Sequence, residues 1–256
     1  MRFAAYQFGV SGNIEKNFEL IRNAVEKAAK QDVDMIIFPE CALSGYPGRD
    51  FSKVNVVNHT SISEKIDQLR ELSDRFSIGI LVGTVAREEN SYNRAYFISP
   101  EKPLQWYDKR ALCGIDAENF SEGTTDGIFE FKGHSIGVRI CYEIRFPEYF
   151  RELYKAHTDF NIVLFNDISE KDDSHRFRTI KSHLVTRAVE NVTPIISVNS
   201  CKPYQTAPSC FLDASGNVMA ECKRNKDGMV VYEFKDKELN AGEINRKNQS
   251  DALLGI

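Results

Sequence analysis

Strand-like segments alternate with amphipathic, helix-like segments along most of this 256-residue chain. Apolar residues recur at helical spacing at about 14–30, at 62–76 and at 177–188, and a further helix is expected to start near Pro147. Between these helices lie strand-length apolar runs, some of which pair as hairpins around turn residues such as Lys132-Gly133. Hairpins mixed with βα crossovers predict an α/β fold of two packed sheets with helices outside, rather than one doubly wound sheet.

The predicted strands are short, and several end abruptly at a polar residue. They cover residues 2–8, 35–39, 78–85, 93–98, 104–107, 127–131, 134–141, 161–165, 194–199, 209–213, 218–221 and 229–234. Three of them end at or just before one candidate reactive group, namely Glu40, Lys109 and Cys141. A carboxylate, an ammonium and a thiol placed this way could converge at one end of a sheet, where α/β folds keep their chemistry.

Each of the three groups also has a structural interpretation. A free cysteine is usually a small buried hydrophobe, and the chain holds five others, Cys41, Cys113, Cys201, Cys210 and Cys222. Glu40 could cap a following helix, and Lys109 could be a solvated charge that closes a strand. The functional interpretation gains weight because the same pattern, an apolar strand followed by one reactive group, occurs three times.

Composition limits the remaining classes of function. A formal net charge of −4 argues against a general nucleic-acid or anionic-membrane surface, and the longest apolar runs are too short to span a bilayer. The cysteines show no disulfide framework and no CxxC pair, and the N-terminal residues lack signal-peptide features, so we expect a reducing, cytoplasmic location. The five histidines lack ligand spacing, so no metal site is predicted.

The length fits one large domain better than two small ones. We place a single domain at residues 1–238 and a C-terminal tail at 239–256. The tail is polar and ends in Leu253-Leu254-Gly255-Ile256. Its apolar end could dock on the body or on a partner subunit, or the tail could be frayed.

Three ordered motifs resemble the nitrilase superfamily of carbon–nitrogen hydrolases: Phe38-Pro39-Glu40, Tyr107-Asp108-Lys109 and the segment 141–148 that starts at Cys141. Flanking segments at 91–95, 187–191 and 213–216 are similar as well, so the resemblance extends from about Phe3 to Phe234. It implies a four-layer αββα sandwich of two mixed sheets flanked by helices. It also implies a Glu–Lys–Cys site without cofactor or metal, and a homodimer or higher homo-oligomer.

The resemblance also implies roles for individual residues. Cys141 would attack an amide carbonyl and form a thioester, with Glu40 carrying protons between the thiol, the leaving amine and water. The Lys109 ammonium and the Tyr142 backbone N–H would hold the oxyanion. Glu118, in the loop after Lys109, would position Lys109 and the substrate amide; alternatively it is a solvated loop carboxylate.

Substrate choice is less constrained by the sequence. Tyr142 stands where nitrile hydrolases of this superfamily often carry Trp, which favours a small linear amide as substrate. The block that begins at Cys141 most resembles the ω-amidase-like branch, and Arg145 could then bind a substrate carboxylate. Alternatively, Arg145 pairs with Glu143 or Glu148. The loops at 166–169 and 199–201 depart from the usual family pattern, and both are expected to line the acyl pocket.

Other functions stay open at this point. Residues 39–47 resemble the glutaminase domain of glutamine-dependent NAD synthetases, which suggests an ammonia donor to a partner protein. A nitrile or N-carbamoyl hydrolase of the same superfamily is a further alternative. The third is a non-catalytic nitrilase-fold interaction subunit, although joint retention of Glu40, Lys109 and Cys141 argues against a decayed site.

Overall fold

The computed structural model describes residues 1–235 and 238–256, so residues 236–237, near the end of the predicted domain, lie outside the described residues. Within that part of the chain, strands and helices follow one another with short connections. In chain order the elements are β1 (Arg2–Gln7), α1 (Ile14–Ala29), β2 (Met35–Ile37), η1 (Val54–Val56), α2 (His59–Phe76), β3 (Gly79–Arg87), β4 (Ser91–Ile98), β5 (Gln105–Asp108), α3 (Ile115–Asn119), β6 (Ile128–Phe131), β7 (His134–Ile140), η2 (Cys141–Arg145), α4 (Pro147–Lys155), β8 (Phe160–Phe165), β9 (Ile168–Ser169), α5 (Ser174–Asn191), β10 (Ile195–Asn199), β11 (Tyr204–Gln205), β12 (Cys210–Leu212), β13 (Val218–Glu221), β14 (Gly228–Glu233) and α6 (Ala241–Leu254).

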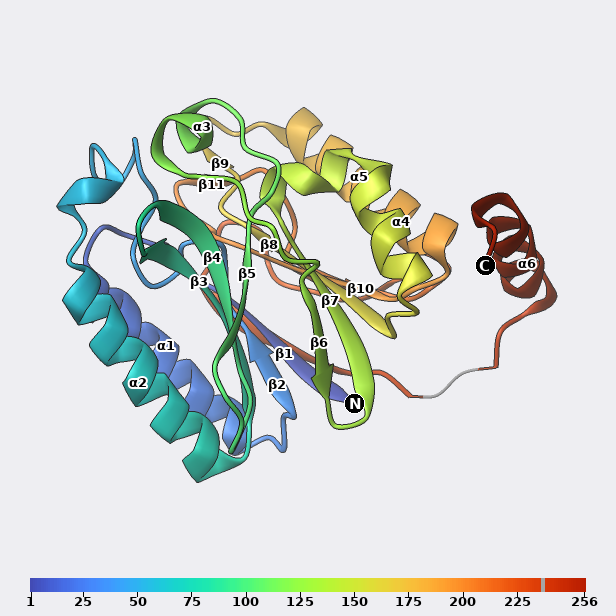
Figure 1. The fold of residues 1–256 in the computed structure, drawn as a ribbon, viewed down its shortest axis with the longest axis horizontal. Coiled ribbons are helices and arrows are strands. Elements are labelled where there is room, and N and C mark those ends of the chain that lie inside the picture. The colour runs from blue at the N-terminus through green and yellow to red at the C-terminus, as the bar shows by residue number, and fades with distance from the viewer. Residues whose placement is uncertain (236–237) are drawn as a thin grey trace.

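Two mixed six-stranded sheets form the centre of the molecule (Figure 1). The first has the order β14-β1-β2-β3-β4-β5 and the second the order β13-β12-β10-β8-β7-β6. Strands β1, β2 and β3 run parallel, and so do β7, β8 and β10, whereas the outer pairs are antiparallel. The mixture follows from the sequence, because helical crossovers permit parallel pairing and the tight turns require antiparallel pairing.

The side chains of the central strands alternate between two cores. On β1, Phe3 and Ala5 face the second sheet, whereas Ala4 faces the helices. The core between the sheets also includes Leu81 of the first sheet and Val138 of the second. This two-residue alternation is the usual consequence of strand geometry, and it makes each central strand apolar on both faces.

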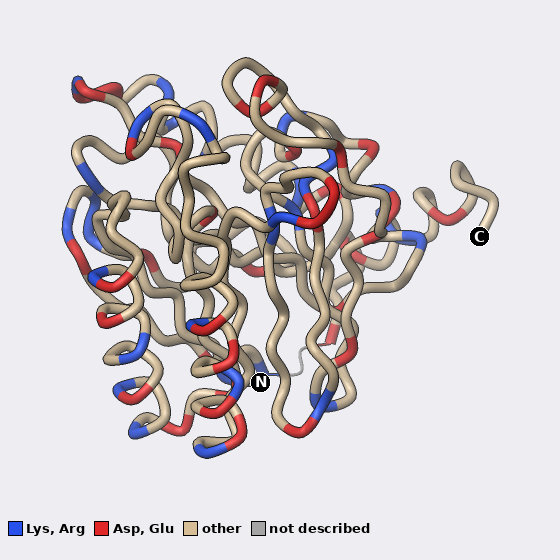
Figure 2. The backbone as a smooth tube through the Cα atoms, turned by 60° about the vertical axis from the view of Figure 1, so that its left-hand side comes forward, with Lys and Arg blue, Asp and Glu red and all other residues tan. Residues whose placement is uncertain are grey.

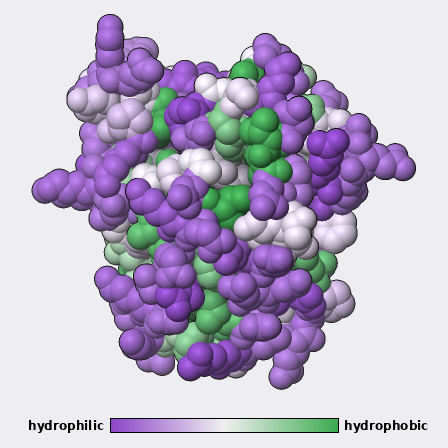
Figure 3. All heavy atoms as spheres, turned by 90° about the vertical axis from the view of Figure 1, so that its left-hand side faces the viewer, coloured by the Kyte–Doolittle hydropathy of each residue, from purple (hydrophilic) through white to green (hydrophobic). Residues whose placement is uncertain are grey.

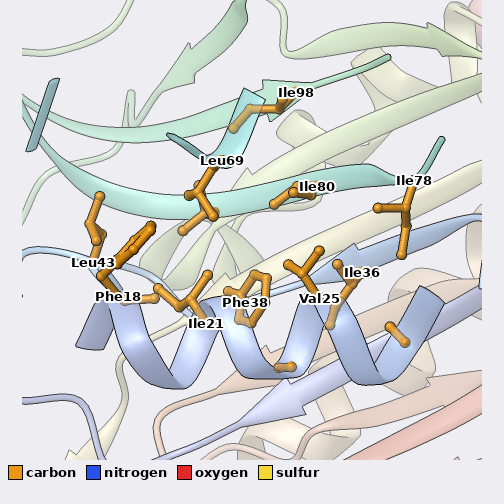
Figure 4. Close-up of a cluster of buried hydrophobic side chains, with 14 of the residues drawn as sticks. Phe18, Ile21, Val25, Ile36, Phe38, Leu43, Leu69, Ile78, Ile80 and Ile98 are labelled. Atoms are coloured by element: carbon orange, nitrogen blue, oxygen red, sulfur yellow. The ribbon is translucent and has the colours of Figure 1, made fainter. Parts of the chain in front are cut away.

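Helices cover both outer faces of the sheet pair, α1 and α2 on the first sheet and α4 and α5 on the second (Figure 1). Figure 4 shows Phe18, Ile21 and Val25 of α1 pointing at strand residues such as Ile36 and Ile80. The helices begin where the sequence supplies a cap: the side chains of Asn13, Asn58 and Asp173 accept hydrogen bonds from backbone N–H groups in the first turns of α1, α2 and α5. Pro147 starts α4.

The predicted αββα fold class is confirmed, and all the predicted helices and strands are present with small shifts of their ends. The sequence did not predict the short α3, the small β9–β11 sheet or the C-terminal helix α6. Residues 241–254 thus form a helix rather than a frayed tail. This helix lies beyond α4 and α5 (Figure 1). The Tyr154 hydroxyl donates to Asp251 Oδ1 at 2.5 Å, and Arg246 Nε donates to the Val189 carbonyl at 3.2 Å.

The surface carries charges of both signs. Figure 2 shows Lys and Arg interspersed with Asp and Glu along the backbone, and Figure 3 shows a largely hydrophilic face on the side where α1 and α2 lie. Over residues 1–235 and 238–256, no helix combines the length and the apolar character that a membrane crossing needs.

Candidate active site

Glu40 and Lys109 follow strands of the first sheet at the same end of the sheet. Glu40 follows β2, and Lys109 follows β5, which runs in the same direction as β2 because two antiparallel pairings separate it from β3. The Glu40 segment passes directly over β3 at Gly83. A Cβ at Gly83 would lie 2.5 Å from the Pro39 carbonyl oxygen and 2.7 Å from Glu40 Cα, so only glycine permits this close approach.

The Lys109 ammonium lies between two carboxylates. Its Nζ is 2.8 Å from Glu40 Oε1 and 2.5 Å from Asp116 Oδ2. Glu40 and Lys109 are each only 1% exposed, so these charges interact with little screening by water. The second oxygen of Asp116 accepts a hydrogen bond of 2.5 Å from the Tyr46 hydroxyl. Lys109 is therefore fixed from two sides. Burial alone would lower its pKa, but the charges of Glu40, Cys141 and Asp116 outweigh burial and raise the pKa well above its usual value.

Glu40 has further partners on both sheets. Asn93 Nδ2, on β4, donates to Oε1 at 2.7 Å, and the backbone N–H of Asn166, which follows β8, donates to Oε2 at 2.8 Å. The Asn166 side chain also donates to the Glu40 carbonyl oxygen at 3.0 Å. Burial raises the pKa of Glu40 above its usual range despite the opposing charge of Lys109, and the nearby Asp116 charge raises it further. A carboxylate with a raised pKa is a stronger base.

Cys141 stands at the junction of β7 and η2, on the second sheet. Its backbone is left-handed, with φ of +47°, so the chain turns sharply at the thiol. The residue is half-buried, and burial of the thiol together with the Glu40 charge raises its pKa well above the usual value, whereas Lys109 lowers it. The charges of Glu40 and Lys109 thus act on the thiol, and the raised pKa favours its protonated form.

The loop after Lys109 presents Asp116 to the site in place of Glu118. Both residues lie on the short helix α3, two positions apart, and a helix turns about 200° over two residues. Asp116 is buried against Lys109, so Glu118 points away and is exposed. Asp116, and not Glu118, therefore makes the contact with Lys109, and a role of Glu118 beside the substrate amide stays a prediction.

Tyr142 and Arg145 follow Cys141 on η2. The Arg145 guanidinium lies 6.0 Å from the Tyr142 ring centroid. Glu143 is fully buried and accepts hydrogen bonds from other residues, and it forms no ion pair with Arg145. Among the residues that the structure describes, Arg145 forms no ion pair or hydrogen bond, including with Glu148. Arg145 is thus a half-buried cation without a carboxylate partner among the described residues.

The loop at 166–169 borders the site through the contacts of Asn166 with Glu40. Asp167 accepts hydrogen bonds from Arg176 Nε at 3.0 Å and from Thr206 Oγ1 at 2.8 Å. The Asp167 charge adds to the burial that raises the pKa of Cys141, and the Arg176 cation interacts with the same thiol. This loop therefore carries an ion pair, Asp167 with Arg176, whose charges act on the pKa of the thiol.

Comparison with known proteins identifies the family. The family model described as carbon–nitrogen hydrolase matches residues 2–241. The chain belongs to the carbon–nitrogen hydrolase family. The 2-oxoglutaramate amidase of Bacillus subtilis is 30% identical to this hydrolase over 238 residues, which are 89% of this chain and 88% of the relative. A glutamine-dependent NAD(+) synthetase of Acinetobacter baylyi is 31% identical over 159 residues, which are 60% of this chain but only 29% of the synthetase.

Solved structures agree on the fold of this hydrolase. An amidase of the nitrilase superfamily from Nesterenkonia AN1, studied as a cysteine mutant, superposes with a TM-score of 0.83 at 19% identity, covering 100% of this chain and 95% of the amidase. At that identity the likeness supports the αββα fold alone. In residues 1–235 and 238–256 of the hydrolase, no group of three or more His, Cys, Asp or Glu side chains is arranged to hold a metal ion.

Sequence reasoning missed three polar residues that surround the Glu40–Lys109 pair in this hydrolase: Asn93, Asp116 and Asn166. For Asp116, the sequence would have had to show which side of the short helix α3 faces Lys109. Asn93 alternates with residues that face the helices, so its strand position could have shown that it points toward Glu40. Asn166 lies in a loop that we expected to line the acyl pocket, but no local pattern could show its contact with Glu40, which spans 126 positions and joins two sheets.

Proposed function

We propose that this carbon–nitrogen hydrolase cleaves a small linear amide through a thioester on Cys141, releasing ammonia and a carboxylate. The observation that carries the proposal is the buried Glu40–Lys109 pair, 2.8 Å apart, within electrostatic reach of the Cys141 thiol. Acyl transfer to sulfur requires a thiol nucleophile, a base that can accept the proton of the thiol, and a cation that is held in place. Cys141, Glu40 and Lys109 supply these three groups.

In the first half-reaction, Glu40 accepts the proton from Cys141 Sγ as the sulfur attacks the amide carbon. Because burial raises the pKa of the thiol, a free thiolate is unfavourable, and proton transfer accompanies the attack. The oxygen of the tetrahedral intermediate carries the negative charge. The Lys109 ammonium and the Tyr142 backbone N–H stabilise it, since the first N–H groups of a helical turn lack intrahelical partners. Glu40 then gives its proton to the departing nitrogen, and ammonia leaves.

In the second half-reaction, water attacks the thioester carbon while Glu40 accepts one of its protons. The second tetrahedral intermediate forms at the same place and is stabilised by the same donors. It collapses when the carbon–sulfur bond breaks, and Glu40 returns the proton to Cys141. Each cycle consumes one amide and one water and yields one carboxylic acid and one ammonia, so the protein is unchanged. Asp116 contributes by holding Lys109 in place throughout.

The substrate carries a carboxylate at the end opposite its amide. Arg145 supports this, because it is half-buried, lacks a carboxylate partner among the described residues and lies near Tyr142. The 2-oxoglutaramate amidase of Bacillus subtilis, whose name states a substrate of this kind, aligns over most of this chain. An ω-amidase-like reaction on an α-keto acid amide is therefore the specific proposal.

A panel of amides tests both parts of the proposal. Ammonia release is measured for 2-oxoglutaramate, glutamine, and neutral amides of similar length, with Cys141→Ala as the inactive variant. Cys222→Ala is the matched control, because this cysteine is half-buried like Cys141 but lies after β13. Ammonia release that persists in Cys141→Ala would overturn the mechanism, and a preference for neutral amides would overturn the carboxylate assignment.

The similarity to NAD(+) synthetases keeps an ammonia donor as the second candidate. That function predicts glutamine as the preferred amide and ammonia release that depends on an added partner protein. Full activity of the isolated chain on 2-oxoglutaramate would rule against it.

We also propose that the chain forms a homodimer or higher homo-oligomer. In support, α6 directs polar Glu243 and Ser250 inward, whereas Ile244 and Leu253 are 45% and 77% exposed. Exposed apolar side chains such as these two are stabilised when a second copy covers them. Light scattering coupled to size exclusion gives the molar mass, and a monomer at micromolar concentration contradicts the proposal.

A further inference from the structure

Lys109 and Cys141 belong to different sheets. Lys109 follows β5 at one edge of the first sheet, and Cys141 follows β7 in the second. Two packed sheets are held mainly by apolar contacts. These contacts fix the distance between the sheets, but because they are non-directional they do less to fix how one sheet is shifted along the other. A reacting pair divided between them therefore needs a polar link close to the two chain exits.

Glu143 provides such a link. It lies two residues after Cys141, is fully buried, and uses both oxygens. Oε2 accepts a hydrogen bond of 2.6 Å from the backbone N–H of Ile140, directly before Cys141. Oε1 accepts from the Tyr107 hydroxyl at 2.7 Å and from the backbone N–H groups of Arg110 and Ala111 at 2.8 and 3.3 Å.

These four donors flank the two reactive residues. Ile140 adjoins Cys141, and Tyr107, Arg110 and Ala111 lie on either side of Lys109. One carboxylate thus joins the chain segment that carries the thiol to the segment that carries the ammonium. Charge-assisted bonds to buried N–H and O–H groups are among the stronger hydrogen bonds in proteins, which suits a contact that must hold a fixed geometry.

We propose that Glu143 is a positioning residue that fixes the Lys109 ammonium relative to the Cys141 thiol by bridging the two sheets. The inference rests on the proposed function for its catalytic consequence, but the geometry it describes is independent of any substrate. Glu143 touches neither the amide nor the sulfur. It acts through Ile140 on one side and through the loop at 110–111 on the other.

Only a glutamate satisfies all four donors. Glutamine has one acceptor oxygen, so its NH₂ group would face either the Ile140 N–H or the cluster of three donors, and a donor would remain unpaired. Aspartate keeps the charge but is one methylene shorter, so it reaches one segment and not the other. The two substitutions therefore separate the bridging function from the charge itself.

The test uses Glu143→Gln and Glu143→Asp in the full chain, with Asp34→Asn as the matched control. Asp34 also joins the two sheets, because it accepts hydrogen bonds from the Arg2 N–H and from Lys132 Nζ, at 2.7 and 2.5 Å. It precedes β2, whereas Glu40 follows β2, so its link lies at the end of the sheets away from the thiol. Thermal unfolding measures the structural cost of each substitution.

Two readouts distinguish positioning from general destabilisation. The first is the rate of Cys141 alkylation by iodoacetamide as a function of pH, which needs no substrate. A displaced Lys109 favours the thiolate less, so both Glu143 variants shift the alkylation profile to higher pH, whereas Asp34→Asn keeps the wild-type profile. The second is amide hydrolysis, where both variants lose about 100-fold in kcat with a change in KM of roughly threefold or less.

The outcomes are decisive in each case. A wild-type alkylation profile in both Glu143 variants overturns the proposal, as does wild-type kcat in Glu143→Asp. If Glu143→Gln and Glu143→Asp do not fold, Tyr107→Phe replaces them, because it removes one of the four donors to Glu143. A loss of about 10-fold in kcat in Tyr107→Phe supports the proposal, and an unchanged kcat overturns it. If the wild type hydrolyses no amide, the proposed function fails, and the alkylation profiles still decide whether Glu143 positions Lys109.

Discussion

Replacing Asp116 by asparagine removes one negative charge beside Lys109 and nearly preserves the shape of the side chain. The asparagine amide could still accept from Lys109 with its oxygen and donate to the Tyr46 hydroxyl oxygen, so both contacts of the carboxylate have a substitute. The substitution therefore tests the electrostatic role of Asp116 rather than its packing. The group that responds is Glu40, because the Asp116 charge adds to the burial that raises its pKa.

The size of the response follows from the geometry. Asp116 Oδ2 and Glu40 Oε1 lie 2.5 and 2.8 Å from the same Lys109 Nζ, so the two carboxylates are close neighbours. Two like charges about 5 Å apart at an effective dielectric constant of about 20 repel by about 3 kcal/mol, equivalent to about 2 pH units. Loss of this repulsion lowers the pKa of Glu40, so Glu40 stays ionised to lower pH. The acid limb of kcat/KM should move down by about 1 to 2 pH units.

The assay is the pH profile of kcat/KM for ammonia release. At the plateau, Asp116→Asn should also lose about 10- to 100-fold in kcat, because Glu40 becomes a weaker base and Lys109 is held less firmly. Glu122→Gln is the matched control, since it removes one charge from the loop after Lys109 at an exposed position, and its profile should equal the wild type. An acid limb that moves in Glu122→Gln but not in Asp116→Asn would refute this reasoning.

Two further predictions concern the fold around the site and the acyl pocket. Gly83→Ala should destabilise the protein by about 1–3 kcal/mol in denaturant unfolding, because the added Cβ would clash with the Glu40 backbone. Gly228→Ala is the control and should leave the stability unchanged, because a Cβ there meets nothing within 4 Å. Equal stability of the two variants would contradict the close-approach argument. Arg145→Gln should raise KM for a carboxylate-bearing amide by about 10-fold or more while leaving a neutral amide within about twofold. The exposed Arg178→Gln on α5 should match the wild type for both substrates, and an equal KM increase for both in Arg145→Gln would contradict carboxylate binding.

Local patterns in the sequence were sufficient to predict the layers of this fold. The apolar stripe that includes Phe18, Ile21 and Val25 predicted α1, and these residues fill the core between α1 and the first sheet (Figure 4). Strand-length apolar runs predicted the central strands for the same reason, since each must be buried on both faces. Glu40 could be singled out because a charge directly after a buried strand is conspicuous, whereas Lys109 follows the half-exposed β5 and was recognised through its motif.

What the sequence left open depends on contacts between distant segments. The choice between Asp116 and Glu118 required the phase of a five-residue helix, which is too short for a periodic pattern. The contact of Asn166 with Glu40 requires knowledge of how the two sheets are packed. Helix α6 was not predicted because its sequence lacks an apolar stripe. It is attached to the rest of the molecule through polar contacts such as that of Tyr154 with Asp251. The catalytic roles of Glu40, Lys109 and Cys141 stay predictions.

The most direct test of the mechanism is the mass of the enzyme during turnover. The wild type is mixed with 2-oxoglutaramate, quenched in acid within the first turnovers and analysed as intact protein and as peptides. Acylation through Cys141 predicts a mass increase equal to the amide minus ammonia, located on the peptide that contains Cys141 and absent in Cys141→Ala. Steady ammonia release with no such adduct, or an adduct on another residue, would contradict the account.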